Sequence, residues 1–72
     1  MNRLLISYDK VADALYIRVR DGKVKESAEI REGVIVDLDD EGVIGVEILN
    51  FSKSGVDLSR VIREGIEILV SS

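Results

Sequence analysis

The stretch that decides the fold runs from residue 33 to residue 49 and reads GVIVDLDDEGVIGVEIL. Aliphatic residues stand at every second position on both sides of a central polar tetrapeptide, which is the pattern of two half-buried strands. They are Val34, Val36 and Leu38 in the first arm, and Ile44, Val46 and Ile48 in the second. The tetrapeptide at 39–42, Asp-Asp-Glu-Gly, has the composition of a turn. The stretch therefore predicts a β-hairpin with one apolar face.

The turn sets the register of this hairpin. Direct pairing of Asp39 with Gly42 would place Val36 opposite Gly45, and the two apolar sets would then lie on different faces. One extra residue restores a common face, so we expect a type I turn that closes with Gly42 in the left-handed region as a G1 bulge. In this register Leu38 pairs with Ile44, Val36 with Val46 and Val34 with Ile48, while Asp37 and Glu47 point outward.

The first twenty residues repeat the pattern. Apolar side chains alternate through Leu4, Ile6 and Tyr8, and again through Leu15, Ile17 and Val19. The segment 9–12 joins the two arms, so a second hairpin is expected, with Tyr8 opposite Leu15 and Leu4 opposite Val19. By parity Tyr8 points inward with its hydroxyl at the rim, and Tyr16 points outward. Residues 24–30 alternate more weakly, which predicts an edge strand or an irregular connection.

The C-terminal part reads as a short helix followed by a strand. Asp57 is a suitable N-cap, because its carboxylate can accept a hydrogen bond from a free amide of the first turn. Leu58, Val61 and Ile62 then fall on one helical face, and Gly65 suits the residue after the helix end. Residues 66–70 alternate again, which suggests a final short strand.

The expected fold class is α+β: an antiparallel sheet of four to five strands built from two hairpins, with one short C-terminal helix packed on its apolar face and a possible final edge strand. That face carries Leu4, Ile6, Ile17, Val36 and Val46. The helix must lie on it, because two isolated turns are marginally stable in water. The whole chain, 1–72, is expected to form a single domain.

Composition excludes several classes of function. A chain of 72 residues has a thin core without room for a deep substrate cavity, and the absence of cysteine excludes disulfides and thiolate metal sites. No apolar run is long enough to span a membrane and no secretory signal is visible, so we expect a cytoplasmic protein. A net charge of −4 disfavours nonspecific binding to nucleic acid or to anionic membranes. The absence of His, Gln, Trp, Thr and Pro, with 33% charged residues, resembles the usage of hyperthermophiles.

Two blocks carry a resemblance to a known family. Residues 8–17 read YDKVADALYI, and residues 33–53 contain GVIVDLD, then Gly, then GVEILN and SK. In order and spacing they resemble the prokaryotic family catalogued as domain of unknown function 2283, apart from Val11, where members often have an acidic residue. The segment after Gly55 aligns with no family pattern. The resemblance implies a fold but no established activity, and it implies an antitoxin-like role, since some members are encoded beside small putative toxins.

Charge is segregated along the sequence. Basic residues gather on or near the first hairpin and acidic residues gather at the tip of the second, Asp39 to Glu41. The candidate interaction surface consists of Arg3, Tyr16, Arg18, Arg20, Lys23 and Lys25. Such a surface could hold single-stranded nucleic acid by stacking and phosphate contacts, could pair with an acidic partner or a second copy, or could simply be solvated. Tyr16 is equally compatible with a contact anchor and with ordinary cross-strand packing.

Carboxylate groupings were weighed for chemistry. Residues 37–42 begin like a calcium loop, but Ile48 stands at the twelfth position, where a bidentate Glu is needed. Asp9 and Asp13 flank the first turn and could form an acid–base or metal-binding pair, although both can instead accept bonds from nearby backbone amides. Without His or Cys the chain lacks the usual proton shuttle and nucleophile, so no catalytic, metal or cofactor-binding residue is assigned.

The favoured function is therefore a non-enzymatic interaction module that binds a small protein partner or itself, through an edge strand at 24–30 or 66–70 or through a charged face. Two alternatives come from other classes. One is RNA binding through Arg18, Arg20 and Tyr16. The other is a metal-dependent hydrolase that uses Asp9, Asp13, Asp37 and Glu47, which strand parity opposes.

Overall fold

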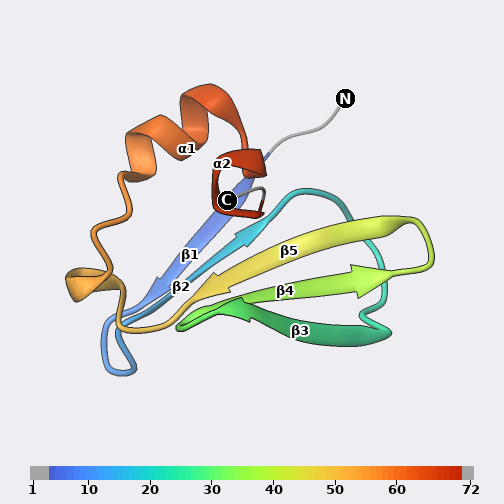
Figure 1. Ribbon diagram of the computed structural model, residues 1–72, viewed down its shortest axis with the longest axis horizontal. Helices are drawn as coiled ribbons and strands as arrows, with labels where there is room; N and C mark the ends of the chain where they lie inside the picture. The colour runs from blue at the N-terminus through green and yellow to red at the C-terminus, as the bar shows by residue number, and fades with distance from the viewer. Residues whose placement is uncertain (1–3, 71–72) are drawn as a thin grey trace.

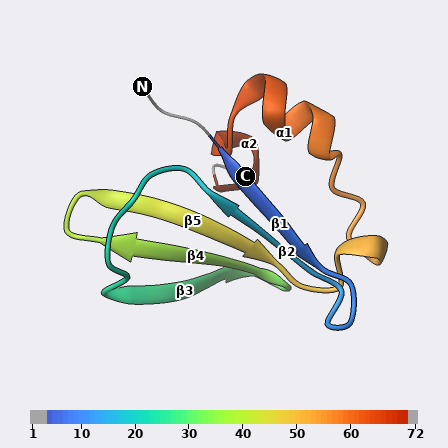
Figure 2. The same ribbon diagram turned by 180° about the vertical axis from the view of Figure 1, so that it is seen from behind.

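The computed structural model describes residues 4–70 of the chain, with Val70 described by its backbone. Five strands form one antiparallel sheet in the order β1-β2-β5-β4-β3. The elements are β1 (Leu5–Asp9), β2 (Ala14–Arg18), β3 (Glu26–Arg31), β4 (Val34–Asp39), β5 (Gly42–Ile48), the 3₁₀ turn η1 (Phe51–Lys53), α1 (Leu58–Glu64) and α2 (Glu67–Val70). Both helices lie on the same side of the sheet, toward the β1 edge and away from β3 (Figures 1 and 2). The expected α+β class, with an antiparallel sheet and a short C-terminal helix, is confirmed.

The core lies between one sheet face and the helices. On the sheet side, the buried residues come from the three inner strands β2, β4 and β5, and on the helix side from α1, α2 and the turn between them. They are Leu15, Ile17, Val34, Val36, Val46 and Ile48, facing Val61, Ile66 and Leu69. Because every one of them is aliphatic, stability rests on apolar burial in a single thin layer. Within the described residues, no helix is both long and apolar enough to cross a membrane.

The central hairpin has the expected faces, but its bulge lies elsewhere. Val34 pairs with Ile48 and Val36 pairs with Val46, as predicted. Asp39 pairs directly with Gly42, so the turn contains two residues, and the extra residue is taken up inside β5.

That extra residue is Ile44. Leu38 pairs with Val43 and Asp37 pairs with Gly45, so Ile44 has no partner in β4, and the predicted pairing of Leu38 with Ile44 is wrong. On the other side of β5, Val19 continues the register of β2, and its amide donates to the Ile44 carbonyl at 3.0 Å.

The first hairpin has the predicted register but a different burial. Tyr8 pairs with Leu15 and Ile6 pairs with Ile17. Ile17 is fully buried, whereas Ile6 and Tyr8 keep 38% and 48% of their surface exposed. Ile6 and Tyr8 therefore lie on the predicted face, but the expectation that they are covered there is wrong. Since β1 has a strand neighbour on one side only, its side chains lack the contacts that bury the same face of β2.

The C-terminal helix begins and ends as predicted, but it is rotated. The Asp57 carboxylate accepts hydrogen bonds from the Ser59 and Arg60 amides, and Gly65 follows the helix with φ of 89°. Val61 is fully buried, whereas Ile62 is 54% exposed, so the prediction that Ile62 faces the sheet is wrong. In α1, Val61 belongs to the buried core and Leu58 packs, partly buried, against it.

Residues 67–70 form α2, so the final strand predicted at 66–70 is wrong. The Leu69 amide donates to the Ile66 carbonyl at 2.8 Å, and both side chains are buried. A spacing of three places them on the same side of a helical turn, whereas a strand would point them to opposite faces. The other uncertain segment, 24–30, does contain a strand, since β3 is the second edge of the sheet.

Candidate interaction surface

The two edges of the sheet differ in chemistry. All five residues of β1 are exposed, and only one of them, Asp9, is charged. Leu5 lies on the outer face at 54% exposure, and Ile6 and Tyr8 lie on the inner face. In β3, by contrast, Glu26, Glu29 and Arg31 place a charge at half of the positions. Charged side chains protect an edge strand from pairing, and apolar ones do not. Of the two edges, β1 is therefore the less protected against strand pairing, and we call it the open edge.

A cluster of four residues fastens the β1–β2 turn to η1. We call it the Asp13 cluster, and it consists of Tyr8, Asp13, Phe51 and Ser52. The Tyr8 hydroxyl donates to Asp13 Oδ1 at 2.6 Å, and the Ser52 hydroxyl donates to Asp13 Oδ2 at 2.7 Å. The Phe51 amide donates to the Asp13 carbonyl at 2.9 Å, and the Phe51 ring packs edge-on against Tyr8 at 5.9 Å. The cluster therefore fixes the end of the open edge strand.

Asp13 has an uncommon backbone conformation and a lowered carboxyl pKa. Its φ is 54°, in the left-handed region that few residues other than glycine adopt. Hydrogen bonds from Tyr8 and then from Ser52 keep the pKa of the Asp13 carboxyl below its ordinary value, while the bond to Asp13 raises the pKa of the Tyr8 hydroxyl. The carboxylate is thus ionised and engaged on both oxygens. Sequence reasoning placed Asp13 at a turn but missed its link to Ser52, although both lie in the family-like blocks.

Two more of the acidic residues weighed for catalysis, Asp9 and Asp37, have structural partners. Asp9 Oδ1 accepts from the Val11 and Ala12 amides at 3.0 and 3.1 Å, as expected for a turn aspartate. Asp37 accepts from the Ser27 hydroxyl at 2.6 Å. In the part of the chain that the structure describes, no three acidic side chains gather closely enough to hold a metal ion.

Tyr16 lies on the outer face, as predicted, and packs across the strands. Its hydroxyl donates to Asp37 Oδ2 at 3.0 Å, two strands away. Burial first, and then the bond to Asp37, raises the pKa of the Tyr16 hydroxyl. Between them lies Gly45, where an added Cβ would stand 2.2 Å from the Tyr16 oxygen. Glycine is therefore required at Gly45 to let the Tyr16 ring cross β5.

Arg20 contacts the acidic hairpin tip. Its guanidinium binds both carboxylate oxygens of Asp39, with Nη1 to Oδ2 at 2.8 Å, and also donates to the Gly42 carbonyl at 3.2 Å. Glu41 lies 3.6 Å from the same guanidinium. The hydrogen bonds from Arg20 lower the pKa of Asp39 to about 2. This pair ties the β2–β3 connection to the end of the central hairpin.

The other candidate basic residues are placed as follows. Arg18 donates to the Arg20 and Gly22 carbonyls at 3.2 and 2.8 Å, and Lys25 Nζ lies 2.5 Å from Asp40 Oδ2. Lys23 is exposed. Arg3 lies outside the described residues. The basic and acidic groups that are segregated in sequence thus meet within one chain, in a mutual pairing that sequence reasoning did not anticipate.

Comparison with known proteins identifies the family of the chain but no individual relative. None of the curated proteins or solved structures compared with the chain matches it. One family model matches residues 5–52, which contain all five strands and all members of the Asp13 cluster. The resemblance seen in residues 8–17 and 33–53 is therefore confirmed, and the chain belongs to the family described as protein of unknown function, DUF2283.

Proposed function

We propose that the protein is a non-enzymatic interaction module that binds an extended segment of a partner protein along the open edge of β1. The observation that carries the proposal is the contrast in charge between two equally exposed edges: β1 has one charged residue in five, whereas β3 has three in six. An edge strand offers a row of backbone donors and acceptors that an incoming strand can pair with. We infer that it acts in the cytoplasm, where cysteine-free domains are ordinary.

Side chains on both faces of β1 contribute to this binding mode. A strand laid beside β1 would pack one set of its side chains against Leu5 and the alternate set against Ile6 and Tyr8. Pairing of this kind takes its affinity from the main chain and its specificity from alternate side chains. The Asp13 cluster holds Tyr8 at the far end of the strand, so β1 is presented in a fixed geometry.

The size of the edge limits the partner. Five residues of strand bury less than the roughly 1,000 Å² that a stable specific interface requires. Val11, in the turn after β1, is 94% exposed and extends the apolar surface beyond the strand. We therefore propose a small partner that pairs with β1 and also contacts this turn, as an antitoxin-like module would bind a small toxin. A second copy of the chain is the other partner with suitable chemistry.

Matched substitutions on the two edges test the proposal. Ile6 and Ile30 are 38% and 43% exposed on β1 and β3, so I6K and I30K make the same chemical change at similar exposure on opposite edges. We expect co-purification with the product of the neighbouring gene, or self-association in sedimentation velocity, to be lost in I6K and kept in I30K. A strictly monomeric wild type that captures no partner would refute the module, and equal loss in both variants would refute the assignment to β1.

The alternatives have less support from the geometry. RNA binding would use Arg18, Arg20 and Tyr16, but all three already make the intramolecular contacts described above. A metal-dependent hydrolase would need its carboxylates gathered, and the described residues contain no such group. Salt-dependent RNA binding, or amide shifts localised at Asp9 and Asp13 on adding Mg²⁺, would favour these alternatives.

A further inference from the structure

The direction of the backbone groups in β1 follows from the neighbouring strands. The Val19 amide, which continues β2, donates to the Ile44 carbonyl of β5 at 3.0 Å. Backbone groups of successive residues point to alternate sides of a strand, so those of Ile17 also point toward β5 and those of Tyr16 point toward β1. Tyr16 pairs with Ser7, and the backbone groups of Ser7 therefore face β2.

By the same alternation, Ile6 and Tyr8 direct their amides and carbonyls away from β2, along the open edge. No strand within residues 4–70 lies beyond β1 to pair with them. Their side chains are 38% and 48% exposed on the inner face, and the hydrogen bond from the Tyr8 hydroxyl to Asp13 holds the ring in place. The open edge thus presents backbone donors, backbone acceptors and two apolar side chains in a fixed arrangement.

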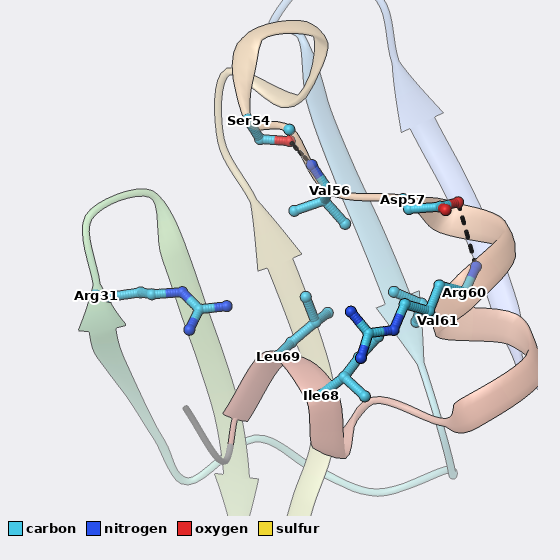
Figure 3. Close-up of a pocket in the computed structure, with 9 residues that line it drawn as sticks. Arg31, Ser54, Val56, Asp57, Arg60, Val61, Ile68 and Leu69 are labelled. Atoms are coloured by element: carbon cyan, nitrogen blue, oxygen red, sulfur yellow. Dashed lines mark hydrogen bonds between the residues drawn. The ribbon is translucent and has the colours of Figure 1, made fainter.

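The junction between the sheet and the C-terminal helices, shown in Figure 3, differs from the open edge in this respect. The Ser54 hydroxyl oxygen accepts a hydrogen bond from the Val56 amide at 3.1 Å, and Asp57 Oδ1 accepts one from the Arg60 amide at 3.3 Å. These two backbone amides therefore already have partners within the chain. Binding through the backbone is better supported at β1 than at this junction.

We propose that a second copy of the chain pairs with β1, antiparallel, about a two-fold axis through Ser7, and so covers the edge that a partner protein would use. This inference rests on the proposed function, because it names an occupant of the same edge. Ile6 of one copy lies opposite Tyr8 of the second copy, and the two residues exchange both of their backbone hydrogen bonds. The two-fold axis repeats this pair on the other side of Ser7.

The register follows from the length and the charge of β1. An axis through Ser7 pairs all five residues of the strand, whereas an axis through Ile6 or Tyr8 leaves residues at one end without a partner in the other copy's β1. Asp9, the charged residue of β1, lies opposite Leu5 in this register, so no like charges meet across the two strands. The apolar side chains of Ile6 and Tyr8 then form cross-strand pairs on the inner face.

The opposite edge does not support the same pairing. In β3 half of the residues are charged, and its register with β4 shifts between Glu29 and Arg31. Charges and bulges both protect an edge strand, so the assembly closes as a dimer with a β3 strand at each end of one continuous sheet. Five residues of strand bury less than a stable interface requires, so the dimer is weak. A partner that also contacts Val11 therefore displaces the second copy.

Introduced cysteines test the register in the full-length chain, which contains no cysteine of its own. Residues of a non-hydrogen-bonded antiparallel pair have Cα atoms about 4.5 Å apart, within the range of about 4.4–6.8 Å that a disulfide spans. Ser7 lies opposite Ser7 of the second copy in such a pair. We expect diamide to convert exposed S7C into a disulfide-linked dimer, seen on a non-reducing gel, to an extent that rises with protein concentration.

Two matched variants control for register and for random collision. L5C lies on the same strand and face, but the two copies of residue 5 are about 13 Å apart in the proposed register, so L5C should stay monomeric. S27C places the same exposed thiol on β3 and should also stay monomeric. Equal cross-linking of all three variants, or more in L5C than in S7C, would overturn the inference.

Failure of the dimer and failure of the proposed function give different results. If S7C stays monomeric with diamide at high concentration, the paired dimer is refuted. The interaction module still stands in that case if the wild type captures the product of the neighbouring gene and I6K does not. If S7C cross-links and no partner is captured, the second copy is the occupant of β1 that the experiment supports.

Discussion

Substitution of Val61 by alanine tests how the helical layer is attached to the sheet. Val61 is the fully buried residue of α1 and lies in the core with residues from the sheet and from α2. The change removes two methyl groups, worth about 1.6 kcal/mol at ~0.8 kcal/mol per buried carbon. The cavity left behind adds to this cost, and the better helix propensity of alanine offsets part of it. We therefore expect V61A to lower the free energy of unfolding by about 2 kcal/mol.

Such a loss is large for a chain of this length. At ~0.05–0.15 kcal/mol per residue, a protein of 72 residues has about 4–11 kcal/mol of stability in total. In small domains each kcal/mol shifts Tm by about 4–8 °C, so Tm of V61A should fall by about 8–16 °C. Thermal unfolding followed by far-ultraviolet circular dichroism measures Tm, and guanidinium titration gives the free energy of unfolding.

The neighbouring residue is the control. Ile62 is 54% exposed, so I62A removes more carbon than V61A but uncovers little buried surface. Alanine also favours the helix. We expect the free energy of unfolding of I62A to stay within about 0.5 kcal/mol of the wild type. If I62A costs as much as V61A, the helix is rotated as the sequence pattern first indicated. If neither variant changes Tm, α1 is not attached to the core.

Substitutions at three further positions, Asp39, Gly45 and Asp13, test contacts between separate elements of the fold. The folded-state pKa of Asp39 is about 2, against an ordinary value of 3.8. Ionisation of Asp39 therefore stabilises the folded protein above pH 3.8, and this contribution is lost as the pH falls through about 2. Between pH 3.8 and about 2, the Tm of the wild type should fall more steeply than the Tm of D39N. G45A should lower the free energy of unfolding by about 1–3 kcal/mol in denaturant titrations, because its Cβ meets Tyr16. The double variant Y16A/G45A should cost less than the sum of the single changes, and strict additivity would refute the contact. D13A should free η1 from the β1–β2 turn and speed hydrogen exchange at the Ser52 amide, and an unchanged rate would show that Asp13 does not hold η1.

The pairing of strands in the sheet could be predicted where only one register places all the apolar side chains on the same face. Val36 opposite Val46 follows from alternation alone, because a slip of one residue would turn every apolar side chain to solvent. The position of the bulge was not predictable, because an extra residue at the turn and an extra residue at Ile44 give the same pairing of Val36 with Val46. Sequence pattern thus determines which residues share a face, and distant contacts determine where an irregularity is placed.

The helical layer was less predictable because its segments are short. Residues 66–70 alternate with a period of two and also place Ile66 and Leu69 three apart, so a run of five residues fits a strand or a helical turn. Burial of both Ile66 and Leu69 against the sheet decides for the helix. Val61 and Ile62 are adjacent on the helix and both are apolar, so the pattern alone does not decide that Val61 is buried and Ile62 is exposed.

The candidate interaction surface could be predicted only in part from the sequence. The exposed β1 edge could not be recognised in advance, because strand order across the sheet is not encoded in local alternation. The Asp13 cluster was easier to predict from the sequence. Tyr8 and Asp13 lie in one family-like block and Ser52 lies in the other, although 39 residues separate Asp13 from Ser52. Polar residues that recur in two blocks of one pattern suggest a contact, whereas the pairing of Arg20 with Asp39 depends on the path of a connection that no pattern specifies.

The extent of the family match separates two parts of this fold. Residues 5–52 supply all five strands and the Asp13 cluster, whereas the segment that covers the core begins after them. A sheet of this kind exposes Ile17, Val46 and Ile48 unless something covers it, and residues 58–69 cover it here. The covering segment therefore buries the apolar face of the sheet but lies outside the residues that match the family. The open β1 edge and the cluster that fixes its end both lie within the matched residues, which is where a function common to the family would have to be located.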